Sequence, residues 1–356
     1  MNFHGGDVYS CTGEVLDFSS NINPLGVPAS FREALWEHLD DFTRYPDLQY
    51  RALKESFAEY LSFDKPEMII PGNGAVEIIF KGIMALDIDT LVNLSPTFSE
   101  YAHAAEQKGV PVLDLNAYNE DYQDLNLEHV LSLIQRKSVV VLCNPNNPTG
   151  TFVDKEKMCA LAGTLKEKDS YLLIDEAFIE FTDGYPQNSM VSELGRFPNV
   201  LVIRAATKFF GMPGIRLGFG VTGNLALVQG IKEQLEPWNV NAAAVIAGCT
   251  VYRDQKYIAA SRLWVQEERQ FLFDRLREIP ELTVYPSRVN YHLVKINEEK
   301  IDAWKLKELL LGKGILIRTP DGFHHLSPYH FRLAVKDRAS NEMMLTALRE
   351  VCSVYG

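Results

Sequence analysis

Short apolar segments alternate with helix-compatible stretches between residue 68 and about residue 235, and this alternation constrains the fold more than any other feature. Each segment has the length of a β-strand, and each stretch between two segments could form a helix that crosses back over a sheet. Repeated units of this kind predict an α/β fold with a mostly parallel central sheet. The predicted strands are residues 68–70, 90–92, 139–142, 171–174, 200–203 and 217–221.

Three of these strands end in polar side chains. One runs into a turn with Asn147, the next ends at Asp175, and a third leads into a turn with Lys208. Ligands of open α/β sheets bind beyond the carboxyl ends of the strands, so these side chains should meet there. An amine that can form a Schiff base, a carboxylate that keeps a pyridine nitrogen protonated, and an amide that donates to a ring oxygen together suit pyridoxal 5'-phosphate. Arg216, eight residues after Lys208, could hold the phosphate of this cofactor.

A second phosphate-binding element follows the first predicted strand. Gly72, Asn73, Gly74 and Ala75 open a helix there, and glycines let backbone N–H groups approach a phosphate at the positive helix end. Glu77 stands where a dinucleotide fingerprint has its third glycine, which argues against a dinucleotide site. An ordinary strand-to-helix turn is the alternative interpretation.

These motifs resemble those of the pyridoxal-phosphate-dependent enzymes of fold-type I, the class I/II aminotransferase-like family. The matching residues are Asn-Pro-Thr-Gly at 147–150, Asp-Glu-Ala-Phe at 175–178, and Lys208 with Arg216. The resemblance implies a large domain with the parallel sheet and a smaller α+β domain. It also implies that Tyr101 stacks on the cofactor ring, and that Tyr45 reaches the cofactor phosphate of the neighbouring subunit in a homodimer.

The chain departs from the wider family pattern at two positions. Ala205 stands where a hydroxyl residue commonly contacts the phosphate, and Thr207 could partly replace that donor. Phe178 stands where many aminotransferases have a tyrosine that donates to the ring oxygen, which leaves Asn147 as the donor. The loss of one hydrogen bond, ~1 kcal/mol net, changes affinity without abolishing binding.

The N-terminal segment resembles that of the L-threonine O-3-phosphate decarboxylases of cobalamin biosynthesis, through His4-Gly5-Gly6 and residues 16–26. In this resemblance Arg332 holds the substrate carboxylate and Arg318 the substrate phosphate, and His4, Gly5, Asn21 and Asn147 complete the substrate pocket. Histidinol-phosphate aminotransferases share much of the scaffold and remain an alternative, with 2-oxoglutarate as second substrate. A non-catalytic pyridoxal-binding or regulatory protein is a third interpretation, against which the intact Lys208, Asp175 and Arg332 argue.

A chain of 356 residues exceeds the size of a single hydrophobic core, so we expect more than one domain. The alternation of strands and helices ends near residue 235 and the pattern changes from Pro237, so we predict a large cofactor-binding domain over residues 31–235 and a small domain over residues 236–356. The resemblance implies that residues 1–30 form an N-terminal arm that belongs with the small domain and the substrate pocket. In the small domain we expect one long helix over residues 242–277 and strands at 282–285, 291–296, 315–318 and 331–334. In the large domain we expect a helix capped by Ser30 and a second helix over residues 51–61.

Charge and composition limit the kinds of binding partner and the location that we expect for this chain. A net charge of −12 disfavours nucleic acids and acidic membranes. No apolar run is long enough for a transmembrane helix, and the first residues lack the features of a signal peptide. Five scattered cysteines favour a reducing, cytoplasmic location. His324, His325 and His330 have no ordered metal-binding motif around them, so we predict a solvated loop and no metal.

Overall fold

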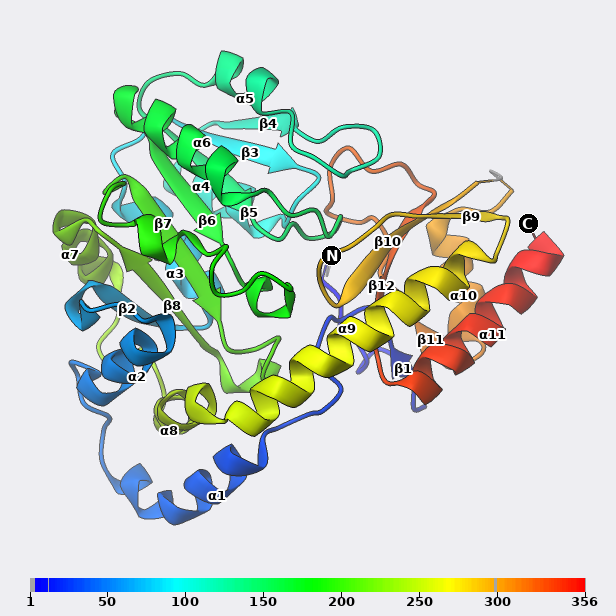
Figure 1. Cartoon of the computed structure of the whole chain (residues 1–356), viewed down its shortest axis with the longest axis horizontal. Helices are drawn as coiled ribbons and strands as arrows, with labels where there is room; N and C mark the ends of the chain where they lie inside the picture. The colour runs from blue at the N-terminus through cyan, green and yellow to red at the C-terminus, as the bar shows by residue number, and fades with distance from the viewer. Residues whose placement is uncertain (1–3, 12, 298–299, 356) are drawn as a thin grey trace.

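The computed structural model describes residues 4–11, 13–297 and 300–355, and it confirms the α/β fold with a mostly parallel sheet (Figure 1). Seven strands form the central sheet, in the order β2-β8-β7-β6-β5-β3-β4. Strand β8 runs antiparallel to both of its neighbours, whereas the pairs from β7 to β4 are parallel. The bounds are β2 Ile69–Asn73, β3 Thr90–Ser95, β4 Val112–Asn116, β5 Ser138–Cys143, β6 Tyr171–Asp175, β7 Val200–Ala205 and β8 Leu217–Thr222.

Strand β4 was missing from the sequence prediction, for a physical reason. It lies at the edge of the sheet, and only one of its five residues is buried, so its sequence, Val-Leu-Asp-Leu-Asn, is less apolar than that of a central strand. The central strands β5 and β6 are buried on both faces, so they read as continuous apolar runs.

Helices cover both faces of this sheet (Figure 1). Successive side chains of β5 point to opposite faces: Val139 and Val141 pack in one hydrophobic cluster, and Val140 and Leu142 in the other. The helices of the large domain are α2 Arg51–Leu61, which matches the predicted range, α3 Ala75–Ala85, α4 Glu100–Lys108, α5 Leu127–Leu133, α6 Lys155–Glu167 and α7 Leu225–Gln234.

The C-terminal part forms a smaller α+β unit (Figure 1). Strands β9 (Leu282–Val284), β10 (Tyr291–Ile296) and β12 (His330–Ala334) form an antiparallel sheet. The N-terminal arm joins this unit, because β1 (Leu16–Asp17) pairs in parallel with β11 (Ile315–Leu316). The helices of this unit are α9 Gln255–Arg277, α10 Ala303–Leu311 and α11 Arg338–Tyr355.

Two helix predictions were wrong in detail, and Asp254 is involved in both. The expected long helix is broken into α8 (Ala242–Thr250), a 3₁₀ turn and α9, because the Asp254 side chain accepts a hydrogen bond from the Tyr257 N–H (2.9 Å) and caps α9. Ser30 does not cap α1 (Ala29–Glu37); its hydroxyl donates to the Asp254 carboxylate (2.6 Å).

The predicted domain boundaries remain a proposal. Helix α8 begins after residue 236 yet packs on the large domain: a Cβ added at Gly248 would lie 2.2 Å from the Leu53 side chain. Within the described ranges, no helix is long and apolar enough to cross a membrane.

Candidate active site

A cavity of about 340 Å³ lies at the carboxyl ends of the central strands, where the arm and the small domain meet the large domain. Most of the predicted site residues line it, although they come from all parts of the chain. They are His4, Gly5, Asn21, Ala75, Tyr101, Asn147, Asp175, Thr207, Lys208, Arg216, Arg318 and Arg332. Gly72, Asn73, Gly74 and Tyr45, which were also predicted, do not line this cavity.

Lys208 lies in the turn after β7, with its side chain only partly exposed in the cavity wall. Burial lowers the pKa of its amine to about 8, and the nearby Arg332 and Arg216 act in the same direction. A part of the lysine is therefore an uncharged amine near neutral pH. This is the state that a nucleophilic lysine needs.

Asp175, at the end of β6, is a buried carboxylate with two hydrogen-bond donors. The Tyr101 hydroxyl donates to Oδ2 (2.7 Å), and the Ala177 N–H donates to Oδ1 (3.0 Å). Burial raises the pKa of this carboxyl, while the two hydrogen bonds favour its charged form. Burying a charged carboxylate costs free energy unless a cation pairs with it directly. A ligand with a protonated nitrogen would supply such a cation at Asp175. The hydrogen bond from Tyr101 was not predicted, and the stacking role of Tyr101 stays a prediction.

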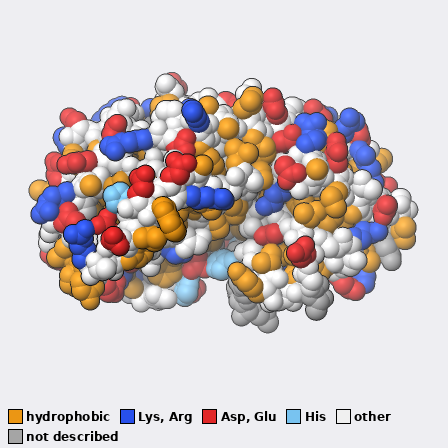
Figure 2. All heavy atoms as spheres, turned by 90° about the horizontal axis from the view of Figure 1, so that it is seen from below, with side chains coloured by type: hydrophobic (Ala, Val, Ile, Leu, Met, Phe, Trp, Pro, Cys, Tyr) orange, Lys and Arg blue, Asp and Glu red, His pale blue; other side chains and the backbone are white. Residues whose placement is uncertain are grey.

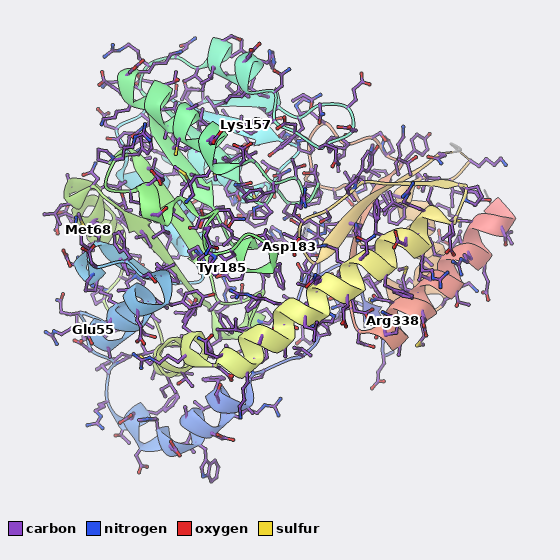
Figure 3. The ribbon with its side chains drawn as sticks, viewed as in Figure 1. Glu55, Met68, Lys157, Asp183, Tyr185 and Arg338 are labelled. Atoms are coloured by element: carbon purple, nitrogen blue, oxygen red, sulfur yellow. The ribbon has the colours of Figure 1, made fainter. Side chains whose placement is uncertain are left out.

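The sequence prediction missed a buried ion network that includes the residue next to Asp175. The fully buried Arg204 on β7 binds Glu176 (3.3 Å), Glu180 (2.5 Å) and the hydroxyl of Tyr185 (3.0 Å), which is labelled in Figure 3. Glu176 directly follows Asp175, so the network fixes the backbone at Asp175, which is a candidate catalytic residue. The only signal in the sequence was a charged residue, Arg204, in an otherwise apolar strand.

The start of α3 and Arg216 form a cradle that fits a phosphate group. Gly74 precedes α3 with a positive φ of 83°, and a Cβ there would lie 2.5 Å from Nη2 of Arg216. Among the described residues, no side chain caps this helix end, which leaves its N–H groups for a ligand. Gly72 instead makes room for Ile78, and the Asn73 N–H donates to Glu77 (2.7 Å).

Two arginines of the small domain enter the cavity side by side. Their backbones pair: the Arg332 N–H donates to the Arg318 carbonyl oxygen (2.8 Å), and the reverse bond is 3.2 Å. The Arg332 guanidinium donates to the Ser19 carbonyl oxygen (2.6 Å) and to Oδ1 of Asn147. Burial lowers the pKa of Arg332 to about 9 and that of Arg318 to about 10, and Arg318 adds to the effect on Arg332. Anionic groups of a ligand would stabilise the two positive charges, which burial and the neighbouring charge disfavour.

The arm closes one side of the cavity. Gly5 lies so close to the Ser19 carbonyl oxygen that a Cβ at Gly5 would be 2.1 Å from it, which explains the need for glycine. His4 lies with Nε2 3.1 Å from the Glu100 carboxylate. Oδ1 of the buried Asn21 has no hydrogen-bond partner among the described residues, so it could accept a bond from a ligand.

Tyr45 lies outside the cavity. The residue is 76% exposed, and its ring stacks on that of Trp238, with centroids 4.4 Å apart. An exposed tyrosine could reach a neighbouring subunit, so its predicted role remains a prediction.

The histidines His324 and His325 contact one carboxylate, Asp114, at 3.1 Å each. The prediction of a solvated loop was wrong for His330, which is buried at the start of β12. In the part of the chain that is described, no group of three or more potential metal ligands is found.

The chain belongs to the aminotransferase class I and II family, whose model matches residues 13–348. Membership of this family identifies pyridoxal 5'-phosphate as the cofactor, as predicted, and the lysine, the carboxylate and the phosphate cradle described above fit this group.

Three individual proteins are similar to this chain over nearly its whole length. The chain is 34% identical to a threonine-phosphate decarboxylase of Salmonella typhimurium, over 98% of this chain and 96% of that protein. It is 40% identical to a protein of Caldanaerobacter subterraneus subsp. tengcongensis that is provisionally named a threonine-phosphate decarboxylase, over 97% of this chain and 93% of that one. A crystal structure described as a histidinol-phosphate aminotransferase from Clostridium acetobutylicum matches with a TM-score of 0.90 and 37% identity, over 96% of this chain and all of that chain.

Proposed function

We propose that this enzyme decarboxylates L-threonine O-3-phosphate to (R)-1-amino-2-propanol phosphate, a step of cobalamin biosynthesis. The observation that carries the proposal is the pair of arginines, Arg318 and Arg332, that line one cavity together with Lys208. Two guanidinium groups suit a substrate with two anionic groups. Phosphothreonine has both a phosphate and a carboxylate in one molecule. Histidinol phosphate has no carboxylate, but its second substrate 2-oxoglutarate has two, so the sequence identity to threonine-phosphate decarboxylases is what favours phosphothreonine.

In this proposal each residue has one task. Arg332 binds the carboxylate, held in place by Ser19 and Asn147. Arg318 and His4 bind the phosphate. With both ends fixed, the substrate would present the bond from Cα to the carboxylate carbon in one orientation, and this orientation would select the bond that breaks.

The cofactor supplies the electron sink that accepts the electron pair left by departing carbon dioxide. Asp175 holds a proton on the ring nitrogen by charge, supported by the hydrogen bond from Tyr101. The partly uncharged Lys208 would be the residue that bonds the cofactor, and its amine would supply the proton that returns to Cα.

We also propose that the enzyme is a cytoplasmic homodimer. None of its five cysteines forms a disulfide, which suits a reducing compartment. Figure 2, which views the molecule from below Figure 1, shows hydrophobic side chains among charged ones on this surface. Large apolar side chains are exposed along residues 36–48 and at Trp238, which would suit a subunit interface: Trp36, Leu39, Phe42, Tyr45 and Leu48.

The test is to incubate the cofactor-loaded enzyme with L-threonine phosphate and to identify the products by NMR. The proposal requires (R)-1-amino-2-propanol phosphate. The structural similarity to a histidinol-phosphate aminotransferase favours a second candidate, so a parallel sample contains histidinol phosphate and 2-oxoglutarate. Glutamate formed in that sample, with no (R)-1-amino-2-propanol phosphate in the phosphothreonine sample, would support the aminotransferase instead.

A further inference from the structure

The loop of residues 319–326, here called the strap, places one aromatic ring beside both arginines of the cavity. Phe323 lies in the middle of the strap, is buried, and lines the cavity. The centre of its ring is 4.8 Å from Cζ of Arg318 and 6.0 Å from Cζ of Arg332. One side chain therefore contacts both groups that we assign to the substrate anions.

An aromatic ring has a physical effect here that an aliphatic side chain lacks. Two guanidinium groups in one cavity repel each other, and the hydrogen bonds from Arg332 to Ser19 and from Arg318 to Asp321 hold only the edges of these groups, not their faces. The negative face of a ring attracts such cations. Tyr291 gives Arg332 a second aromatic contact, at 5.3 Å. The rings thus keep both guanidinium groups in the cavity before substrate binds.

The strap is tied to the small domain on one side of Phe323. The carboxylate of Asp321 accepts hydrogen bonds from the Thr319 hydroxyl (2.6 Å) and from the indole N–H of Trp304 on α10 (2.9 Å). The carbonyl oxygen of Asp321 accepts a bond from the Arg318 guanidinium (2.5 Å).

On the other side of Phe323 the strap is tied to the large domain. His324 and His325 both contact Oδ2 of Asp114, on the edge strand β4. Asn93 (2.7 Å) and Ser95 (2.6 Å), both on β3, donate to its Oδ1. Burial alone would raise the pKa of the Asp114 carboxyl, but the hydrogen bonds from Ser95, Asn93 and His324 outweigh it and hold the pKa below its ordinary value. Asp114 is therefore a fixed anion that faces the strap.

We propose that Phe323 is a positioning residue for Arg318 and Arg332, and that the contact of Asp114 with His324 and His325 holds Phe323 in place. The proposal rests on the proposed function, because it takes the two arginines as the groups that bind the substrate phosphate and carboxylate. It adds that the large domain, through an edge strand distant in sequence, helps to set the geometry of a small-domain binding site.

The first test compares Phe323→Leu with Phe323→Tyr, which keeps the ring, and with Phe271→Leu as the matched control. Phe271 also lies under an arginine, Arg338 (3.7 Å), which begins α11 and is labelled in Figure 3, and neither residue lines the cavity. From the strength of cation–π contacts we expect Phe323→Leu to raise the KM for phosphothreonine roughly tenfold, with kcat changed less than about threefold. Phe323→Tyr should lie near wild type, and Phe271→Leu should match wild type.

A binding measurement separates this proposal from the proposed function. Inorganic phosphate should bind the cofactor-loaded enzyme, and Phe323→Leu should weaken this binding by a similar factor, whichever reaction the enzyme catalyses. If wild type binds phosphate but releases no carbon dioxide from phosphothreonine, the proposed function fails and the role of Phe323 is still tested. If Phe323→Leu binds phosphate and substrate as well as the Phe271→Leu control does, Phe323 is not a positioning residue.

The part played by Asp114 is tested by a double-mutant cycle. Asp114→Asn should raise the KM in the same direction as Phe323→Leu, and the double variant should be little worse than Phe323→Leu alone, because the two residues act through one element. Fully additive effects would overturn the link between Asp114 and Phe323. Asp114→Asn also keeps the proposal testable if Phe323→Leu does not fold.

Discussion

Replacement of Lys208 by methionine should make the cofactor-free protein more stable, although it abolishes activity. In the folded protein the pKa of this amine is about 8, against an ordinary 10.5, mainly because of burial. Below about pH 8, a lysine with such a depressed pKa lowers the free energy of unfolding by the full penalty. This penalty disappears as the pH rises toward 10.5. At ~1.4 kcal/mol per tenfold change in proton affinity, the whole penalty is about 3–4 kcal/mol. Water in the cavity screens part of it, so we expect a gain of about 2 kcal/mol at pH 7 and about 1 kcal/mol at pH 9.5.

The assay is urea unfolding of cofactor-free wild type and Lys208→Met at the two pH values. Lys305→Met, which removes an exposed lysine on α10, is the matched control and should change stability little at either pH. The reasoning is refuted if Lys208→Met is no more stable than wild type at pH 7, or if its advantage does not shrink at pH 9.5.

Three further predictions concern the site. Asp175→Asn should weaken cofactor binding and lower kcat at least about tenfold, because a neutral amide cannot hold the ring proton by charge. Absorbance titration measures the binding, and steady-state kinetics measure kcat. Activity near wild type would mean that another acid keeps the ring nitrogen protonated. Arg318→Ala should lower kcat/KM for phosphothreonine roughly ten- to a hundredfold, from a charge-assisted contact of ~1.5–3 kcal/mol, and change little for threonine; an unchanged preference for the phosphorylated substrate would contradict the assignment. Tyr45→Ala and Lys208→Ala subunits should each be inactive or weak alone, yet regain activity when refolded together, because a mixed dimer restores one intact site; no regain would argue against shared active sites.

Much of the fold could be predicted because the central strands are buried on both faces. Strands such as β5 and β6 leave an unbroken apolar run, and their polar ends mark the ligand edge of the sheet. The edge strand β4 lacks that pattern, since it is only partly covered and includes Asp114. The break between α8 and α9 depends on the side chain of Asp254, which helix periodicity alone does not reveal.

The site was predictable where the chemistry needs a particular residue type and much less where a contact depends on tertiary packing. Lys208, Asp175 and Arg332 stand out because few other residues form imines, hold a ring proton or bind a carboxylate. The hydrogen bond from Tyr101 to Asp175 joins residues 74 positions apart. Phe323 reads as an ordinary apolar residue in a loop, and only the fold brings its ring to the two arginines.

The measurement that tests the central claim most directly is the amount of carbon dioxide released per substrate consumed. L-threonine phosphate with a labelled carboxylate carbon is incubated with the cofactor-loaded enzyme in the absence of any 2-oxo acid. The account predicts one labelled carbon dioxide for each phosphothreonine consumed, and no release from a Lys208→Ala variant. Retention of the label in the amino acid, together with amino transfer from histidinol phosphate to added 2-oxoglutarate, would contradict it.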